Sequence, residues 1–362
     1  MAKPGIALIL SGGGMKGLAH VGVLQALAER GLEPDLVVGS SIGALIAAVW
    51  AIGTPLDEMV GLARQVKRRH VFALARGDMA FHGMRAPAIY RKEPLETLIE
   101  AMIGRPTFQQ LKRRILVNTV DLQSGVQVLW GLHGLDDVPV ADAVFASCAL
   151  PGIFPPRVIR GRQYVDGAVV ENLPVGALLA AGHGAVVAVN LNPIGPIYKM
   201  QRELDESGFA ATYIRGLELV MQMQSAGRLR SWQRGPLVLV QPRVAHISMF
   251  AFDRTDELIA EGWRATAEAL DELEAPIEAL APGIHPRRMV RLEVDRDRCV
   301  GCGACALLAP DVFAMDGHQR AIVLQPVHYW SPVDGVYVGH CPTFAISVSP
   351  VEAKSAEGAS EA

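Results

Sequence analysis

The chain has 362 residues, half of them hydrophobic, and a formal net charge of −3. This length favours one large domain and one small one, and the weak negative charge gives no indication of a nucleic-acid partner. No run of about 18 uncharged apolar residues predicts a membrane span, and the short apolar start does not resemble a cleavable leader. We therefore expect a cytoplasmic protein, in a compartment where thiols stay reduced.

The first predicted elements are a strand, a glycine-rich turn and a helix. Residues 5–10 are apolar without alternation, as in a buried parallel strand, and residues 18–30 carry apolar side chains at helical spacing. A glycine-rich turn in this position aims backbone N–H groups at one point and can bind an anion. The residues of this predicted loop are Gly12, Gly13, Gly14, Met15, Lys16 and Gly17.

The second predicted strand leads into a Gly-x-Ser-x-Gly pattern centred on Ser41. The strand ends at about residue 38, and an apolar helix follows from residue 42 to 52. On a strand-to-helix turn this pattern predicts a nucleophile elbow, which places the serine beside the N-terminus of the helix. Gly39 and Gly43 suit the sharp turn and the close approach of neighbouring chain.

Two interpretations compete for the glycine-rich loop. Gly12-x-Gly14-x-x-Gly17 fits a dinucleotide-binding fingerprint, but that motif requires an acidic residue at the end of the second strand. Here the second strand is followed by Ser41 instead. A nucleophile beside a loop rich in N–H groups favours an oxyanion hole, in which the backbone donors stabilise the charge formed on an attacked carbonyl.

Residues 54–110 predict an irregular, helix-rich region with a basic run at residues 67–70. The ordinary interpretation is a solvated helix face with core contacts. A second interpretation is a lid, or a patch that contacts anionic lipid headgroups at the inner face of a membrane. The methionine and phenylalanine side chains that would suit an acyl chain are Met59, Phe72, Met79, Phe81 and Met84.

Strands are predicted at residues 114–120, 126–130 and 185–191, and a short helix at 141–150, before a proline-rich loop. Cys148 in that helix is interpreted as a small buried hydrophobe. A further strand at 162–166 ends in Asp166 and a glycine. Asp-Gly often forms a turn, but a serine hydroxyl needs a base to become a nucleophile, and functional groups are displayed at strand ends of α/β sheets.

The choice of base lies between Asp166 and a histidine, as in the Ser–Asp–His order of α/β-hydrolases. His183 precedes a predicted strand, at the wrong edge of the sheet, while His246 has no supporting motif and His20 lies in the first helix. We therefore predict a Ser41–Asp166 dyad in which the carboxylate accepts the hydroxyl proton directly.

Four blocks, at residues 11–24, 38–43, 146–155 and 165–168, resemble the signature blocks of bacterial patatin-like phospholipases. This resemblance covers about residues 5–280. It implies a three-layer α/β/α fold with a mainly parallel sheet, and it maps a Ser–Asp dyad onto Ser41 and Asp166 and an oxyanion loop onto residues 12–17. The implied reaction is hydrolysis of lipid acyl esters through an acyl-enzyme on serine.

The C-terminal quarter carries four of the five cysteines, as Cys299-x-x-Cys302-x-x-Cys305 and a later Cys341-Pro. This spacing is typical of iron–sulfur ligation, whereas zinc sites usually take paired Cys-x-x-Cys units. The sequence has no second cysteine group for a second cluster. We therefore expect the four thiolates to hold one [4Fe–4S] cluster.

Residues 289–351 resemble single-cluster bacterial ferredoxins, which implies a small α+β domain. Residues 1–281 would form the hydrolase domain, 282–288 an exposed linker, and 352–362 a disordered tail. The stretch 325–339 contains few acidic residues, so an acidic docking face of the usual ferredoxin kind is not indicated.

Two functions remain open for the whole protein. The first is a serine lipid acyl hydrolase of the phospholipase or lysophospholipase type, with the cluster domain serving electron transfer or redox control. The second is a redox-sensing or electron-transfer protein whose patatin-like domain mainly binds a lipid or protein partner. The expected partners are an acyl-ester lipid, a membrane surface and a redox protein.

Overall fold

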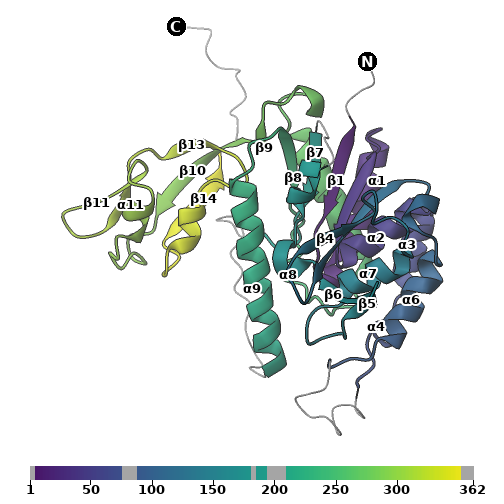
Figure 1. The fold of residues 1–362 in the computed structure, drawn as a ribbon. Coiled ribbons are helices and arrows are strands. Elements are labelled where there is room, and N and C mark those ends of the chain that lie inside the picture. Colours follow the sequence, from purple (N-terminus) through teal and green to yellow (C-terminus); the bar gives the residue numbers. More distant parts are fainter. Residues whose placement is uncertain (1–4, 76–87, 181–184, 194–208, 352–362) are drawn as a thin grey trace. The chain divides into compact units, whose positions relative to one another are not determined.

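The computed structural model describes residues 5–75, 88–180, 185–193 and 209–351 (Figure 1). These residues fall into two compact units, the first ending at Gly283 and the second beginning at Ile284. His183, Met79, Phe81, Met84 and the predicted disordered tail lie outside the described residues. Within the described part of the chain, no helix is both long and apolar enough to cross a membrane.

The first unit is built on a mixed sheet with the strand order β5-β6-β3-β2-β1-β7-β8-β9, and β4 also pairs with β3. The parallel strands are β1 (Ile6–Leu10), β2 (Leu36–Ser40), β3 (Arg114–Asp121), β7 (Ala185–Val189) and β8 (Pro236–Val240). The antiparallel strands beside β3 are β4 (Gln127–Trp130), β5 (Arg157–Ile159) and β6 (Arg162–Asp166).

Helices cover both faces of this sheet (Figure 1). As a result, β1, β2 and β7 are buried at every position. The helical elements are η1 (Gly14–Leu18), α1 (Ala19–Glu29), α2 (Ile42–Ala51), α3 (Leu56–Gln65), α4 (Arg68–Val71), α6 (Glu93–Ile103), η3 (Phe108–Gln110), α7 (Val140–Cys148), α8 (Ala168–Glu171), η4 (Val175–Ala180), α9 (Phe209–Arg230), α10 (Thr255–Asp271) and η5 (Ile277–Ala279). The predicted α/β/α class with its mainly parallel sheet is confirmed.

The closest helix packing joins α1 to α10 through glycine. A Cβ added to Gly22 would lie 1.9 Å from the carbonyl oxygen of Ile259, and one added to Gly262 would lie 1.9 Å from that of Ala19. Only glycine lets two helix backbones approach this closely. The crossing holds α1, and with it the glycine-rich loop before α1, against the rest of the unit.

Three strands of the sheet, β5, β8 and β9, were not predicted. Residues after the proline-rich loop form β5, which pairs with β6 through a two-residue turn at Arg160 and Gly161. Both turn residues have positive φ, at 50° and 77°, as a tight hairpin requires. Gly161, between the short stretches Arg157-Val158-Ile159 and Arg162-Gln163-Tyr164, was a local signal for this hairpin.

The second unit is a small α+β fold, as predicted. Strands β10 (Arg288–Val294), β13 (Val327–Trp330) and β14 (Ile346–Pro350) form an antiparallel sheet. A hairpin of β11 (Phe313–Met315) and β12 (Ala321–Val323), with α11 (Ala304–Leu308) and η6 (Val336–His340), completes it. Leu292, Phe313, Val338 and Ile346 form its core.

The stretch 282–288 is not the exposed linker that its composition predicts. It contains strand β9 (Gly283–His285), and the side chains of Ile284 and His285 are buried. The reason is that the Gly283 amide donates to the carbonyl of Gly235, so the backbone here is engaged in the sheet.

Candidate active site

Ser41 is the single residue between the end of β2 and the start of α2. Its φ of 54° and ψ of −127° are strained for a residue with a side chain, as a nucleophile elbow requires. At both flanking positions, a side chain larger than that of glycine would clash with neighbouring backbone. A Cβ on Gly39 would lie 2.5 Å from the backbone of Ala44, and one on Gly43 would lie 2.4 Å from the carbonyl oxygen of Leu10.

A serine from α7 holds this elbow in place. The amide of Ser41 donates to the Ser147 hydroxyl oxygen at 2.9 Å, and that hydroxyl donates to the main-chain carbonyl of Asn118 at 2.7 Å. Ser147 is fully buried, so the two bonds satisfy groups that water does not reach. Ser147 was not among the predicted site residues, although it lies inside the patatin-like block at residues 146–155.

Asp166, the last residue of β6, lines the same cavity as Ser41. Its side chain is only 2% exposed, and its carboxylate accepts a hydrogen bond from the amide of Ala168 at 2.9 Å. Burial raises the pKa of this carboxyl to about 7, and the nearby Ala168 amide and Ser41 hydroxyl offset only part of that shift. The fold therefore brings the two predicted side chains together.

The route by which Asp166 reaches this position differs from the one expected. β6 runs antiparallel to β3, so the rule for carboxyl ends of parallel strands does not apply to it. Instead, β3 continues to Asp121, beyond the level at which Asn118 pairs with Ser40. β6 returns along this extension and ends where Asp166 pairs with Thr119, one residue from that level.

Of the two alternative histidines within the described ranges, neither contacts the pair. His246 is exposed, and its Nε2 lies 3.4 Å from Glu257 Oε1. His20 is fully buried, and its Nε2–H donates to the main-chain carbonyl of Ser11 at 2.8 Å. Burial lowers the pKa of His20 to about 4, so it is neutral near pH 7.

The glycine-rich loop lies against Ser41, because a Cβ on Gly12 would be 3.0 Å from the Cβ of Ser41. The Gly12 amide already donates to Asn172 Oδ1 at 3.0 Å, and the Met15 amide donates to the carbonyl of Met249 at 2.9 Å. Among the described residues, the amides of Gly13 and Gly14 have no hydrogen-bond partner. These two are the loop donors available to a ligand.

The other two residues of the predicted loop, Lys16 and Gly17, connect the loop to Asn192 and to α2. Lys16 is buried, and its Nζ donates to Asn192 Oδ1 at 3.5 Å. Gly17 packs on the first residue of α2, since a Cβ there would lie 2.1 Å from Ile42. Asn192 in turn donates to the Gly12 carbonyl at 3.4 Å, so both sides of Gly12 are held.

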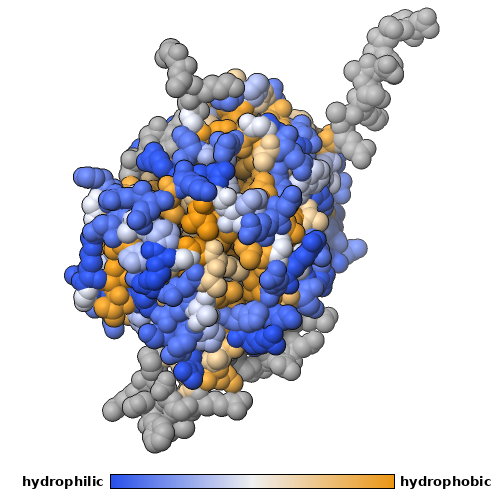
Figure 2. All heavy atoms as spheres, turned by 90° about the vertical axis from the view of Figure 1, so that its right-hand side faces the viewer, coloured by the Kyte–Doolittle hydropathy of each residue, from blue (hydrophilic) through white to orange (hydrophobic). Residues whose placement is uncertain are grey.

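Ser41, Asp166, Gly13 and Gly14 all line one cavity of about 150 Å³. The rest of its wall is almost entirely apolar. The apolar side chains that α2, α3 and α6 contribute are Ile42, Leu45, Ile46, Val49, Met59, Leu62, Ala63, Leu95, Leu98 and Met102. Figure 2 shows apolar side chains gathered across the middle of one face of the molecule, bordered by polar ones.

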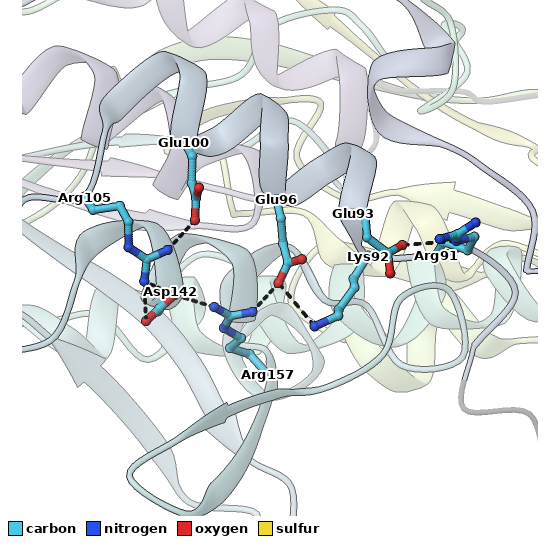
Figure 3. A network of polar contacts seen from close by, with 8 residues as sticks. All are labelled: Arg91, Lys92, Glu93, Glu96, Glu100, Arg105, Asp142 and Arg157. Carbon is cyan, nitrogen blue, oxygen red and sulfur yellow. Dashed lines mark hydrogen bonds and ion pairs between the residues drawn. The ribbon is translucent and has the colours of Figure 1, made fainter.

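Ion pairs anchor the α6 wall of this cavity (Figure 3). Arg157 bridges Glu96 of α6 and Asp142 of α7, the latter at 2.6 Å, and its guanidinium lies over the ring of Phe145. Arg105 joins Glu100 to the same Asp142. Because these partners are half-buried, the network fixes α6 against α7, the helix that carries Ser147.

The four cysteines of the second unit line a single small cavity. Gly301 and Gly303, between the first three, adopt φ of 74° and 73°, which favours glycine. The amide of Ala345 donates to Cys341 Sγ at 3.2 Å, and that of Ala321 to Cys299 Sγ at 3.5 Å. Bonds of this kind are typical of cluster-ligating sulfurs.

Two of these cysteines have pKa values that are shifted in opposite directions. Burial raises the pKa of Cys341, but hydrogen bonds from the Thr343 hydroxyl and from backbone amides outweigh it and lower the pKa below its ordinary value. Burial raises the pKa of Cys305.

Over the described ranges, no group of three or more His, Cys, Asp or Glu side chains could hold a metal ion. The four sulfurs surround a cavity and do not converge on a single ion.

Comparison with known proteins agrees with both units. Residues 8–179 match the family described as patatin-like phospholipase, and residues 294–333 match the one described as 4Fe-4S single cluster domain of Ferredoxin I. An uncharacterized NTE family protein of Mycobacterium tuberculosis H37Rv is 32% identical over 191 residues, which are 53% of this chain and 50% of that protein. Lysophospholipase NTE1 of Mycosarcoma maydis is 27% identical over 304 residues, 75% of this chain and 15% of that protein.

Among solved structures, the chain is similar to VipD from Legionella pneumophila, with 16% identity and a TM-score of 0.42 over 74% of this chain and 66% of that one. The chain spans about half the length of the mycobacterial relatives that it matches. With the two matched regions and the two folded units in agreement, the chain carries a patatin-like phospholipase domain followed by a 4Fe-4S single-cluster domain of the ferredoxin I kind.

Proposed function

We propose that the first unit is a serine acyl hydrolase that cleaves lipid esters with a Ser41–Asp166 dyad. The observation that carries this proposal is that Ser41, on its strained turn, and the buried Asp166 carboxyl line one apolar cavity together with the Gly13 and Gly14 amides. A carboxyl whose pKa lies near 7 is suited to accept and return a proton at neutral pH.

The chemistry follows from this geometry. Ser41 Oγ attacks the carbonyl carbon of the ester while its proton moves to Asp166. The carbonyl oxygen becomes negative and receives hydrogen bonds from the Gly13 and Gly14 amides. The intermediate then collapses, the bond to the alcohol breaks, and Asp166 returns the proton to the leaving oxygen. Water, deprotonated by Asp166, releases the acyl group from Ser41 by the same steps.

The lipid class of the substrate is supported by the cavity wall. Its apolar side chains exclude water and offer contacts to an acyl chain, worth up to about 0.8 kcal/mol for each buried methylene. A lysophospholipase is among the similar proteins.

Contact with an anionic membrane surface is a further part of the proposal. It is supported by the exposed Lys67, Arg68 and Arg69, which precede Val71 and Phe72 of the cavity wall.

For the second unit, we propose that Cys299, Cys302, Cys305 and Cys341 hold one [4Fe–4S] cluster. The donor set fits this group, because four thiols line one cavity and two of them accept backbone N–H bonds. When bound, such a cluster supplies one-electron redox chemistry. Electron transfer or redox control of hydrolysis would be its role in the whole protein.

The test of the hydrolase is an assay with a chromogenic acyl ester. Ser41→Ala and Asp166→Asn are each expected to lower kcat by about 10³-fold or more, because the nucleophile and its base act as one unit. His246→Ala is the matched control and should keep wild-type activity. Fluorophosphonate should label Ser41. Wild-type activity in Asp166→Asn would exclude the dyad, and an inactive wild-type chain would favour the binding or redox function.

A further inference from the structure

One buried side chain, Asn118 at the centre of β3, contacts Ser40, Gly167 and Glu171. These residues adjoin Ser41, Asp166 and the asparagine that holds the glycine-rich loop. Asn118 is fully buried, and it pairs with Ser40 across the parallel strands. Its Nδ2 lies 3.3 Å from the Ser40 hydroxyl oxygen, to which it donates. Ser40 directly precedes the nucleophile, so this bond ties Asn118 to the base of the elbow.

The second contact reaches the catalytic carboxylate. A Cβ on Gly167 would lie 2.4 Å from the side-chain amide of Asn118, which shows that the two residues are in close contact. Gly167 directly follows Asp166. The main-chain carbonyl of Asn118 also accepts the Ser147 hydroxyl, whose oxygen holds the amide of Ser41.

The third contact reaches the oxyanion loop. Nδ2 of Asn118 also donates to the main-chain carbonyl of Glu171 at 2.8 Å. The next residue, Asn172, accepts the Gly12 amide through its side chain and so holds the loop that carries Gly13 and Gly14. The remaining polar atom of Asn118, Oδ1, accepts from Gln127 at 2.9 Å. Every polar group of the Asn118 side chain is therefore used.

We propose that Asn118 is a positioning residue that sets the nucleophile, the base and the oxyanion loop at their mutual distances. This inference rests on the hydrolase function proposed above. The physical reason is that attack geometry tolerates little error, and a displacement of about 1 Å can cost about 10²-fold in rate. Asp166 lies more than a hundred residues after the oxyanion loop and Ser41 in the chain, and Asn118 is hydrogen-bonded to or packed against a residue that adjoins or holds each of these segments.

The experiment compares Asn118→Leu with Thr266→Val. Thr266 is equally buried, in α10, and its hydroxyl donates to the Gly262 carbonyl of its own helix, outside the cavity wall. Both substitutions replace a buried polar side chain by an apolar one of similar size. Asn118→Leu should lower kcat by about 10²-fold with KM within about threefold, and slow fluorophosphonate labelling of Ser41 by a similar factor. Thr266→Val should lower the unfolding midpoint and leave kcat within about twofold.

A second variant covers the case in which Asn118→Leu does not fold. Asn118→Asp keeps the size and the bond from Gln127 but loses both donated bonds, so it should show the same loss of kcat. Equal kcat in the folded fractions of wild type and Asn118→Asp would overturn the proposal. A wild-type chain that cleaves no ester would instead refute the hydrolase function, which keeps the two failures distinct.

Discussion

At the scale of single residues, the site depends on how burial changes one carboxyl group. Asp166 has lost nearly all its water, and no cation is hydrogen-bonded to it among the described residues. Loss of hydration penalises the charged form, which raises the pKa of Asp166 to about 7, well above the value of an exposed aspartate. The neighbouring thiol of Cys148 is affected in the same direction, since burial and then the charge of Asp166 raise its pKa.

The pH dependence of hydrolysis follows from this pKa. Asp166 must be ionised to accept the Ser41 proton, so kcat/KM should rise with pH and level off above an inflection near pH 7. An exposed aspartate as base would give an inflection near pH 4. The measurement is kcat/KM on a chromogenic ester from acid to mildly alkaline pH, with Ser41→Ala giving the background. A profile without an inflection between pH 5 and 9 would contradict the assignment of the base.

At the scale of elements, α2 and α6 form two walls of the cavity, and α3 and α9 also contribute side chains to it. α2 turns one face to it, because Ile42, Leu45, Ile46 and Val49 recur at helical spacing. From Ser41 to Val49 the helix rises about 12 Å, at 1.5 Å per residue. α6 contributes Leu95, Leu98 and Met102, and the Arg157 network holds it in place. An acyl chain attached at Ser41 would therefore run between α2 and α6.

A larger side chain on α6 should shorten the acyl chain that the enzyme prefers. Met102→Trp fills part of the cavity, so the gain of up to about fourfold in kcat/KM per added methylene should end at a shorter chain than in the wild type. Ala101→Trp, on the exposed face of the same helix, is the control and should keep the wild-type profile. The measurement is kcat/KM for nitrophenyl esters of increasing acyl length. Identical profiles for both variants would exclude α6 as the wall of the acyl site.

At the scale of the whole molecule, the five cysteines are divided between the two units. Cys148 lies in the first unit and lines the cavity beside Ser41, while the other four line the cavity of the second. Their backbone N–H bonds and left-handed glycines suit a bulky cluster with several sulfurs better than one compact ion.

Iron content distinguishes the two groups of cysteines. The full chain, reconstituted with iron and sulfide without oxygen, should hold about four iron atoms and show a broad visible absorption band. Cys341→Ala should lose most of both, because it removes one of the four proposed ligands. Cys148→Ser should retain both. Full iron content in Cys341→Ala, or zinc in place of iron, would show that the cluster assignment is wrong.

The sequence alone determined the elements and the residues that local patterns can encode. The strand at residues 6–10, the glycine-rich turn, the Ser41 elbow and the helix after it are confirmed as elements, because periodicity and turn residues act over a few neighbouring positions. The cysteine spacing likewise indicated its cluster domain. The β5–β6 hairpin, strand β8 and the structured stretch 282–288 were missed, although Gly161 was a local signal for the hairpin.

Only the tertiary structure decided how these pieces meet. The antiparallel course of β6 brings Asp166 to Ser41, and side-chain alternation along a strand is the same in either direction, so the sequence could not reveal it. The fold also decided that the Gly12 and Met15 amides are occupied and those of Gly13 and Gly14 open, and that Asn118 and Ser147 lie beneath the site. Each of these contacts joins residues far apart in the chain, and such pairings form only when strands and helices pack together.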